Sequence, residues 1–267
     1  MTPPVESAEG EVYRFGVLSQ RSAVLTAKHW NPILAWVSRR SGVELELNVA
    51  RTAPESNKAI AAGDYDFVYS NTIFLPATAA QGYQVILRPR TTAISSQIVT
   101  LKDSPIQALQ DLAGREVGFP SKAAFVGYAV PMDHLLREKI EVQPVFGGNQ
   151  EGIMGQLQAM RVMAAGVNSQ VMRHFAAREN LAYRVLWESQ AFHNLPIAAH
   201  PRVSGDHVEA VRRAFVEMPD NPEGAQVLEV AAKELNQDPP YGFVRATHQD
   251  YRNYVDFYRT CLTPDIE

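Results

Sequence analysis

Apolar runs of strand length alternate along the chain with segments whose apolar residues recur at helical spacing. Residues 12–18 (VYRFGVL) have a buried-strand pattern, 27–40 place apolar positions three and four residues apart, and 43–50 alternate with period two. Further strands are predicted over 66–70 and 83–89, with helices over 54–63 and 72–82 between the strands.

A second set of elements begins near residue 96. The pattern predicts strands over 96–103, 116–120, 142–148, 161–167, 182–189 and 196–203, and helices near 104–114, 124–139, 149–160 and 168–179. The first of these helices has Ser104 in the N-cap position, Pro105 in its first turn and Gly114 beyond its end. Helical patterns fill the rest of the chain.

The alternation of strands and helices predicts an α/β protein with mainly parallel sheets and helices on both faces. About ten strands fit two sheets better than one, and two extended segments separate the two sets of elements. Ligands of open α/β sheets bind beyond the carboxyl ends of the strands, which places a site in the cleft between lobes. We therefore expect lobe 1 over 12–90 plus 196–267, lobe 2 over 97–188, and hinge crossovers near 91–96 and 189–195.

Composition narrows the class of protein. The 267 residues are 46% hydrophobic and 20% charged, with a net charge of −4, and the isoelectric point is about 6.0. This balance of charges does not indicate a nucleic-acid-binding protein, which would show a basic face. The sequence has no run of about 18 apolar residues, so no membrane span is expected. The one cysteine, Cys261, excludes an intramolecular disulfide and a multi-cysteine metal site. The seven histidines show no metal-ligand spacing and no catalytic signature is present, so we expect no metal, no cofactor and no enzyme activity.

The first eleven residues are polar and rich in Pro, Glu and Ser, which predicts a disordered leader over 1–11. They contain neither a basic n-region nor an apolar h-region. The start is compatible with a native cytosolic protein, and equally with an exported protein whose signal ended before residue 1.

The stretch GFPSKAAFVGYAVPMDHLL (118–136) leads from an apolar run through a loop into a helical pattern. A helix start offers free N–H groups and the positive end of the helix dipole, which is a typical way to hold an anion. Such a loop usually adds hydroxyls or glycines, but here Ala124, Phe125 and Val126 occupy it.

Five motifs, in order, resemble one family. They are FGVLSQ, HWNPILAWVSRRSGVELEL, AIAAGDYDFVYSN, LKDSPIQALQDLAGREVGF and VGYAVPMDHLL. The chain is similar over residues 12–258 to the substrate-binding proteins of phosphate, phosphite and phosphonate ABC transporters. The resemblance implies the two-lobed fold of type II periplasmic binding proteins.

The resemblance also implies ligand positions, several of which carry altered residues here. A hydroxyl cluster of the family falls on Ala124, Phe125 and Val126, and an acidic residue falls on Asn168. A phosphonate buried without enough donors costs several kcal/mol, so either other donors such as Lys122 compensate or the ligand is less charged. We expect a pocket more apolar than in phosphonate-binding relatives. The candidate ligand-binding residues are Tyr69, Ser70, Asn71, Ser96, Lys122, Ala124, Phe125, Val126, Tyr128, Asn149, Gln150, Asn168 and His193.

The resemblance favours a monomeric periplasmic protein that captures a phosphonate- or phosphite-like oxyanion for an ABC permease. Its alternatives are a ligand-sensing partner or sensor domain of a membrane sensor kinase, and a binder of a less charged, partly apolar ligand. An enzyme on the same fold and a cytosolic effector-binding domain are more remote readings. No nucleic-acid partner is expected.

Overall fold

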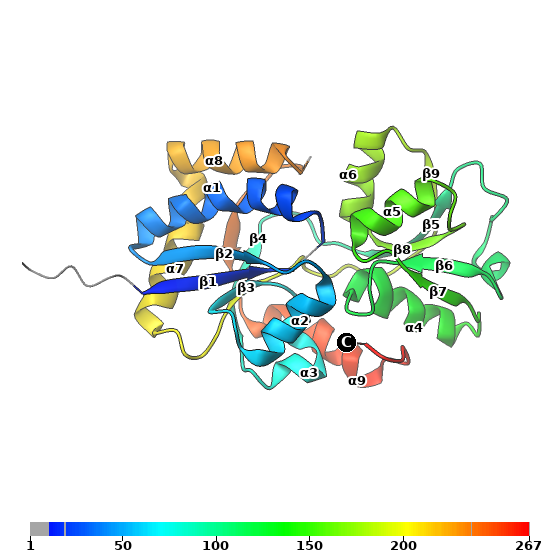
Figure 1. The fold of residues 1–267 in the computed structure, drawn as a ribbon, viewed down its shortest axis with the longest axis horizontal. Helices are drawn as coiled ribbons and strands as arrows, with labels where there is room; N and C mark the ends of the chain where they lie inside the picture. Colours follow the sequence, from blue (N-terminus) through cyan, green and yellow to red (C-terminus); the bar gives the residue numbers. More distant parts are fainter. Residues whose placement is uncertain (1–10, 19, 236, 267) are drawn as a thin grey trace, which may run out of the picture.

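Two β-sheets lie side by side along the long axis of the molecule (Figure 1). This computed structural model describes residues 11–18, 20–235 and 237–266, so the predicted leader lies outside the described residues except for Glu11. The six-stranded sheet has the order β11-β4-β10-β3-β1-β2, and the five-stranded sheet has the order β7-β6-β8-β5-β9. We call the parts of the chain built on these sheets lobe 1 and lobe 2.

The strand bounds follow the predicted apolar runs closely. Lobe 1 contains β1 (Val12–Val17), β2 (Glu44–Val49), β3 (Phe67–Tyr69), β4 (Gln84–Pro89), β10 (Ile197–Ala199) and β11 (Phe243–Arg245). Lobe 2 contains β5 (Ser96–Leu101), β6 (Glu116–Phe119), β7 (Gln143–Phe146), β8 (Ala165–Asn168) and β9 (Tyr183–Glu188).

Both sheets are mixed, and each contains three neighbouring strands that pair in parallel, in the orders β3-β1-β2 and β7-β6-β8. In lobe 1, β1 pairs in parallel with β2 and β3, while β10 runs antiparallel between β3 and β4. In lobe 2, β6 pairs in parallel with β7 and β8, and β5 is antiparallel to β8 and β9. The predicted α/β class with two flanked, mainly parallel sheets is confirmed.

Helices cover both faces of the sheets (Figure 1). In lobe 1, α1, α7 and α8 pack together on one face, over a core that includes Phe15, Trp30 and Phe215. The other face carries α2, α3 and α9. The helix bounds are α1 (Ala23–Ser41), α2 (Ala53–Ala62), α3 (Pro76–Ala79), α4 (Val130–Arg137), α5 (Gln150–Gln158), α6 (Ser169–Glu179), α7 (Gly205–Glu217), α8 (Pro222–Lys233) and α9 (Arg252–Thr260).

Two predicted helices differ from the structure, and one strand of the structure was not predicted. The helix over 104–114 is wrong, because only a short 3-10 turn forms at Leu109–Leu112. The Ser104 hydroxyl accepts the Ile106 N–H at 3.2 Å, which stabilises a local turn instead of a helix start. The strand β11 was not predicted, since three residues show no period and antiparallel pairing with β4 holds them. The helix near 124–139 begins with a wide π-helical turn, Phe125–Ala129, before α4.

The start of α1 decides what lies at the carboxyl edge of the lobe 1 sheet. Ser22 caps the helix by accepting the Leu25 N–H at 3.3 Å, and Gly42 ends it with φ 73°. Because only a short turn separates β1 from this helix, Arg21 and the first turns of α1 sit directly beyond the end of the strand.

An aromatic cluster joins the lobes at the crossovers and at the C-terminal helix. Ile94 and Phe192, one from each crossover, form an isolated β-bridge. Phe125 of lobe 2 stacks on Tyr254 of α9 with ring centres 4.2 Å apart, and meets Phe192 edge-on at 4.9 Å. We call Ile94, Phe125, Phe192 and Tyr254 the crossover cluster.

The segment after α9 continues onto lobe 2. The Thr263 hydroxyl donates to the Ala129 carbonyl at 2.7 Å, and the Leu262 N–H donates to Asp133 at 2.7 Å. The C-terminal segment therefore tethers the lobes in addition to the two crossovers.

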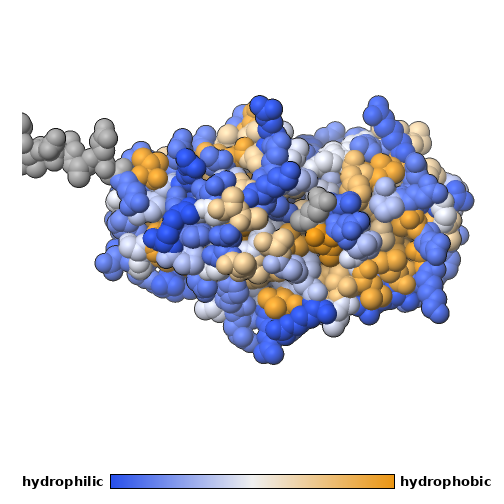
Figure 2. Space-filling model, turned by 60° about the horizontal axis from the view of Figure 1, so that its bottom comes forward, coloured by the Kyte–Doolittle hydropathy of each residue, from blue (hydrophilic) through white to orange (hydrophobic). Residues whose placement is uncertain are grey.

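The two lobes differ in surface polarity on one face of the molecule. Figure 2 shows mostly hydrophilic groups over lobe 1, whereas apolar groups gather over the half of this face that belongs to lobe 2.

Replacing Phe125 with Ala should destabilise the protein strongly. Phe125 is only 2% exposed, and Phe→Ala changes at such positions lower the free energy of unfolding by about 3–5 kcal/mol. The measurement is urea denaturation followed by circular dichroism. The control is Val230→Ala on α8, where a side chain 53% exposed should matter by less than about 0.5 kcal/mol. Equal effects of the two changes would contradict the role of the crossover cluster.

Candidate functional site

Three adjoining cavities lie between the lobes, where strands of both sheets end. One has a volume of about 30 Å³ and the other two of about 40 Å³ each. The first two share Leu18 and Gln20 in their walls, and the last two share His29, Trp30 and Tyr69. The three cavities together form one cleft, with walls from both lobes.

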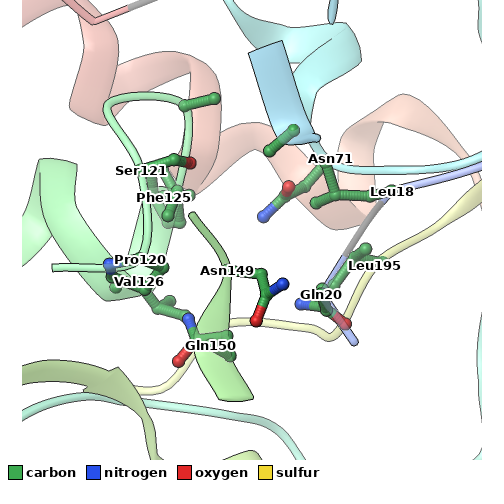
Figure 3. Close-up of a pocket in the computed structure, with 14 residues that line it drawn as sticks. Leu18, Gln20, Asn71, Pro120, Ser121, Phe125, Val126, Asn149, Gln150 and Leu195 are labelled. Atoms are coloured by element: carbon green, nitrogen blue, oxygen red, sulfur yellow. The ribbon is translucent and has the colours of Figure 1, made fainter. Parts of the chain in front are cut away.

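The first cavity, the apolar chamber, is lined by the altered loop Ala124–Val126 and by four amide side chains (Figure 3). Gln20 and Asn71 reach it from lobe 1, and Asn149 and Gln150 from lobe 2. The amides give this chamber neutral donors and acceptors but no charge.

The lobe 2 wall of the apolar chamber is fixed by local hydrogen bonds. Asn149 caps α5, with its Oδ1 accepting the Gly152 N–H at 2.8 Å. Gln150 is 4% exposed, and its Oε1 accepts the Asn168 N–H at 3.2 Å. A Cβ at Gly127 would lie 2.7 Å from Cγ of the rigid Pro120 ring and 2.6 Å from Gln150 Nε2, so glycine allows this close approach. This wall therefore combines an apolar turn, Ala124–Val126, with the amides of Asn149 and Gln150.

The second cavity, the arginine chamber, contains a cation that the sequence analysis did not single out. Arg21 lines it, and within the described residues no hydrogen bond or ion pair holds the guanidinium. Burial lowers the pKa of Arg21, and the charge of Glu151 acts in the opposite direction. Glu151 is itself paired with Arg178 at 2.6 Å, so its charge is already largely compensated. An arginine remains protonated at neutral pH, so the cleft holds an uncompensated positive charge.

Arg21 could have been found from the position of its segment. It follows β1 by four residues, and residues beyond the carboxyl ends of parallel strands face the ligand in open α/β sheets. The family resemblance pointed to Tyr69 after β3 but not to the turn after β1. Gln170 and Asn194, which share a hydrogen bond of 2.8 Å between α6 and the second crossover, were also missed.

The third cavity, the aromatic chamber, is bounded by Trp30, Tyr69, Tyr241 and Phe243. Trp30 and Tyr69 have ring centres 4.8 Å apart, and Phe243 lies about 6 Å from both rings (5.9 and 6.2 Å). Burial raises the pKa of Tyr69, so its hydroxyl stays protonated. His29 lies between this chamber and the arginine chamber, because it lines both.

The structure brings seven of the thirteen predicted ligand residues to the cleft. They are Tyr69, Asn71, Ala124, Phe125, Val126, Asn149 and Gln150. Phe125 and Val126 have a second role, because both are buried and belong to the hydrophobic core that surrounds the crossovers.

Three other predicted residues make contacts away from the cleft walls. Lys122 pairs with Asp265 of the C-terminal segment at 3.7 Å. Tyr128 packs in the lobe 2 core against Phe119 and Phe146, with both ring-centre distances 5.2 Å. The Ser70 hydroxyl shares a 2.7 Å hydrogen bond with the Thr72 hydroxyl, beneath the strand end.

The last three predicted residues lie behind the cleft walls. Asn168 caps α6, its Oδ1 accepting the Gln170 N–H at 2.9 Å, and supports Gln150 from behind. Ser96 is fully buried at the start of β5 beside Asn168 in the strand register. The carbonyl of His193 accepts the Tyr254 hydroxyl at 2.5 Å, and the next residue, Asn194, lines the cleft instead.

The described residues lack two further features, a metal-ligand cluster and a membrane-spanning helix. No three His, Cys, Asp or Glu side chains there are grouped so that they could hold a metal ion. In the same part of the chain, no helix has the length and apolar character needed to cross a membrane.

A model of one protein family matches residues 15–251: ABC transporter, phosphonate, periplasmic substrate-binding protein. The chain belongs to this family. Members of this phosphonate-binding family bind substrates for ABC transporters and are not enzymes. No curated protein sequence matches the chain.

Solved structures confirm the type II binding-protein fold. A binding protein of an ABC phosphonate transporter from Pseudomonas aeruginosa is similar with a TM-score of 0.79 and 17% identity, covering 94% of this chain and 87% of that one. PhnD1 from Prochlorococcus marinus, in complex with methylphosphonate, has a TM-score of 0.78 and 14% identity, with 93% and 97% covered. A Xanthomonas citri protein bound to ATP has a TM-score of 0.70 and 14% identity, with 94% and 99% covered.

His29 makes the stability of the protein depend on pH. Burial lowers the pKa of His29 to about 4, and the nearby charge of Arg21 acts in the same direction. In the unfolded chain its pKa is about 6.5, so between these values only the unfolded state takes up the proton. The free energy of unfolding should therefore fall by up to about 3 kcal/mol as the pH drops through this window.

The change His29→Asn removes this titration and keeps a side chain able to bond the Ala231 carbonyl. Urea denaturation from neutral pH down to about pH 4 should show a shallower loss of stability in the variant than in the wild type. Lys28→Asn, at the neighbouring exposed position of α1, is the control and should retain the wild-type slope. Parallel slopes for His29→Asn and the wild type would show that His29 does not titrate as argued.

Proposed function

We propose that the protein captures a small phosphonate- or phosphite-like oxyanion between its lobes, on the periplasmic side, for an ABC permease. The observation that carries the proposal is Arg21, a cation in the cleft with no partner among the described residues. An anion in the arginine chamber would compensate this charge with charge-assisted hydrogen bonds. Membership of the phosphonate-binding family supports the same ligand class.

Contacts across the mouth of the cleft support capture by closure of the lobes about crossovers near 91–96 and 189–195. Arg173 of α6 in lobe 2 pairs with Asp238, beyond α8 of lobe 1, at 2.6 Å. His174 lies 3.5 Å from the same carboxylate. Both partners of the Arg173–Asp238 pair are more than half exposed, so the pair adds about 0–1 kcal/mol to a closed state that the ligand would mainly stabilise.

The cavity volumes favour a small ligand. A water needs roughly 10–15 Å³ of such space, so each chamber holds about two to four water-sized groups. This fits an anion with a short substituent, and it does not fit a nucleotide.

The apolar chamber favours an anion that carries carbon over inorganic phosphate. Ala124, Phe125 and Val126 offer no hydroxyl to a second face of the oxyanion, but they can contact an alkyl group. The same wall supports a second candidate, a partly apolar ligand of lower charge. The two candidates differ in whether Arg21 is needed for binding.

Thermal unfolding against a ligand panel tests the proposal. The panel contains phosphate, phosphite, methylphosphonate, aminoethylphosphonate, carboxylates and neutral amides. A ligand at about 100 times its dissociation constant adds roughly 2.7 kcal/mol, and we expect a phosphonate or phosphite to do so. A response only to neutral compounds would overturn the oxyanion proposal.

Arg21→Ala should weaken binding of the oxyanion by about 10- to 100-fold, because hydrogen bonds to charged groups contribute about 1.5–3 kcal/mol. Arg21→Lys should restore part of the affinity, since lysine keeps the charge but loses the planar fork. Calorimetric titration measures both. Arg39→Ala, on the exposed end of α1, is the control and should bind like the wild type. Unchanged affinity in Arg21→Ala would remove the basis of the proposal.

A further inference from the structure

His29 presents a hydrogen-bond acceptor to the cleft. Its Nδ1 lies 2.7 Å from the carbonyl oxygen of Ala231 on α8. A carbonyl only accepts, so Nδ1 must carry the proton of this hydrogen bond. In the neutral ring the other nitrogen, Nε2, then has a lone pair and no proton.

The surroundings keep the ring in this state. His29 is 7% exposed, and burial together with the charge of Arg21 disfavours the protonated form. Trp30 meets the ring edge-on, with ring centres 5.5 Å apart. Tyr69, the remaining titratable group that lines both chambers with His29, stays protonated because burial raises its pKa. The described residues that line the three cavities include no Asp or Glu.

The fixed tautomer distinguishes His29 from the amides of the cleft. A free amide can rotate to present either its oxygen or its N–H group, and a hydroxyl can likewise donate or accept. His29 cannot adapt in this way, because rotating the ring or moving its proton would break the bond to Ala231. A ligand atom facing Nε2 must therefore donate a hydrogen bond or leave the lone pair unpaired.

We propose that Arg21 and His29 form a subsite that selects the protonated form of an oxyanion. Arg21 holds the ionised oxygens, and His29 Nε2 accepts the remaining hydroxyl hydrogen of the same group. A phosphonate or phosphite monoanion carries one such hydroxyl. A sulfonate has none, because it is fully ionised near neutral pH. A fully ionised or sulfonate group would place oxygen lone pairs against the lone pair of Nε2. This inference rests on the proposed oxyanion function and adds which oxyanions the cleft accepts.

The test compares methylphosphonate with methanesulfonate, two anions of similar shape that differ in this hydroxyl. Calorimetric titration is made below the second ionisation of methylphosphonate. The wild type should bind the phosphonate at least about tenfold more tightly than the sulfonate. The affinity of the wild type for the phosphonate should fall as the pH rises through that ionisation. The affinity for the sulfonate should not change in the same way, because the sulfonate has no proton to lose in this range.

Two variants separate the acceptor from the anchoring of the ring. His29→Asn keeps a group at the Nδ1 position for the Ala231 carbonyl and removes Nε2, so the preference should shrink to about one. His29→Gln places an amide oxygen near the Nε2 position and should keep part of the preference. Arg21→Lys should weaken both anions by a similar factor and leave their ratio unchanged.

The outcomes distinguish a failure of the His29 inference from a failure of the proposed oxyanion function. If the wild type binds both anions equally, the His29 inference fails and the oxyanion function stands. If it binds neither anion and no other oxyanion, both fail. If His29→Asn does not fold, two other measurements still test the inference: the pH dependence of phosphonate binding by the wild type, and the phosphonate-to-sulfonate preference of His29→Gln. A wild-type affinity for methylphosphonate that stays unchanged across its second ionisation would overturn the inference.

Discussion

The packing of Phe125 against Tyr254 determines much of the geometry between the lobes. The ring comes from the first turn at the carboxyl end of β6, where the resemblance places a ligand-facing hydroxyl, and it stacks on the C-terminal helix of the other lobe. One side chain therefore joins the lobe 2 cradle to α9 and to both crossovers. Burying this ring contributes several kcal/mol, more than a single exposed ion pair across the mouth supplies.

This packing bears on the distribution of polar groups in the cleft. Once position 125 is used for interlobe contact, the lobe 2 wall offers an anion backbone N–H groups, the Ser121 hydroxyl and the amides of Asn149 and Gln150. The positive charge of the cleft then lies on the opposite wall, at Arg21 after β1. Lobe 1 therefore supplies the positive charge of the cleft, and lobe 2 supplies an apolar surface with neutral polar groups.

Most of the fold could be predicted from the sequence, but the site could be predicted only in part. The period of apolar positions identified ten of the eleven strands of the described chain, because core burial imposes that period. Short elements held by tertiary pairing, such as β11, leave no such signal. Within the cradle, spacing could not show that Tyr128 turns into the lobe 2 core while Phe125 reaches the cleft, since the wide π-helical turn changes the usual side-chain directions. Arg21 and His29 lie outside the altered cradle motif, in the turn after β1 and in α1, where no sequence pattern marks a ligand position.

The crossovers of this protein run through apolar packing, with Ile94 and Phe192 bridged and surrounded by the rings of Phe125 and Tyr254. Opening of the lobes would expose part of this aromatic surface to water, and closing would bury it again. Water around apolar surface has a high heat capacity, so capture of even a very small, polar ligand would carry a negative heat-capacity change. The calorimetric signature of binding would then report the repacking of the crossovers more than the few contacts of the ligand itself.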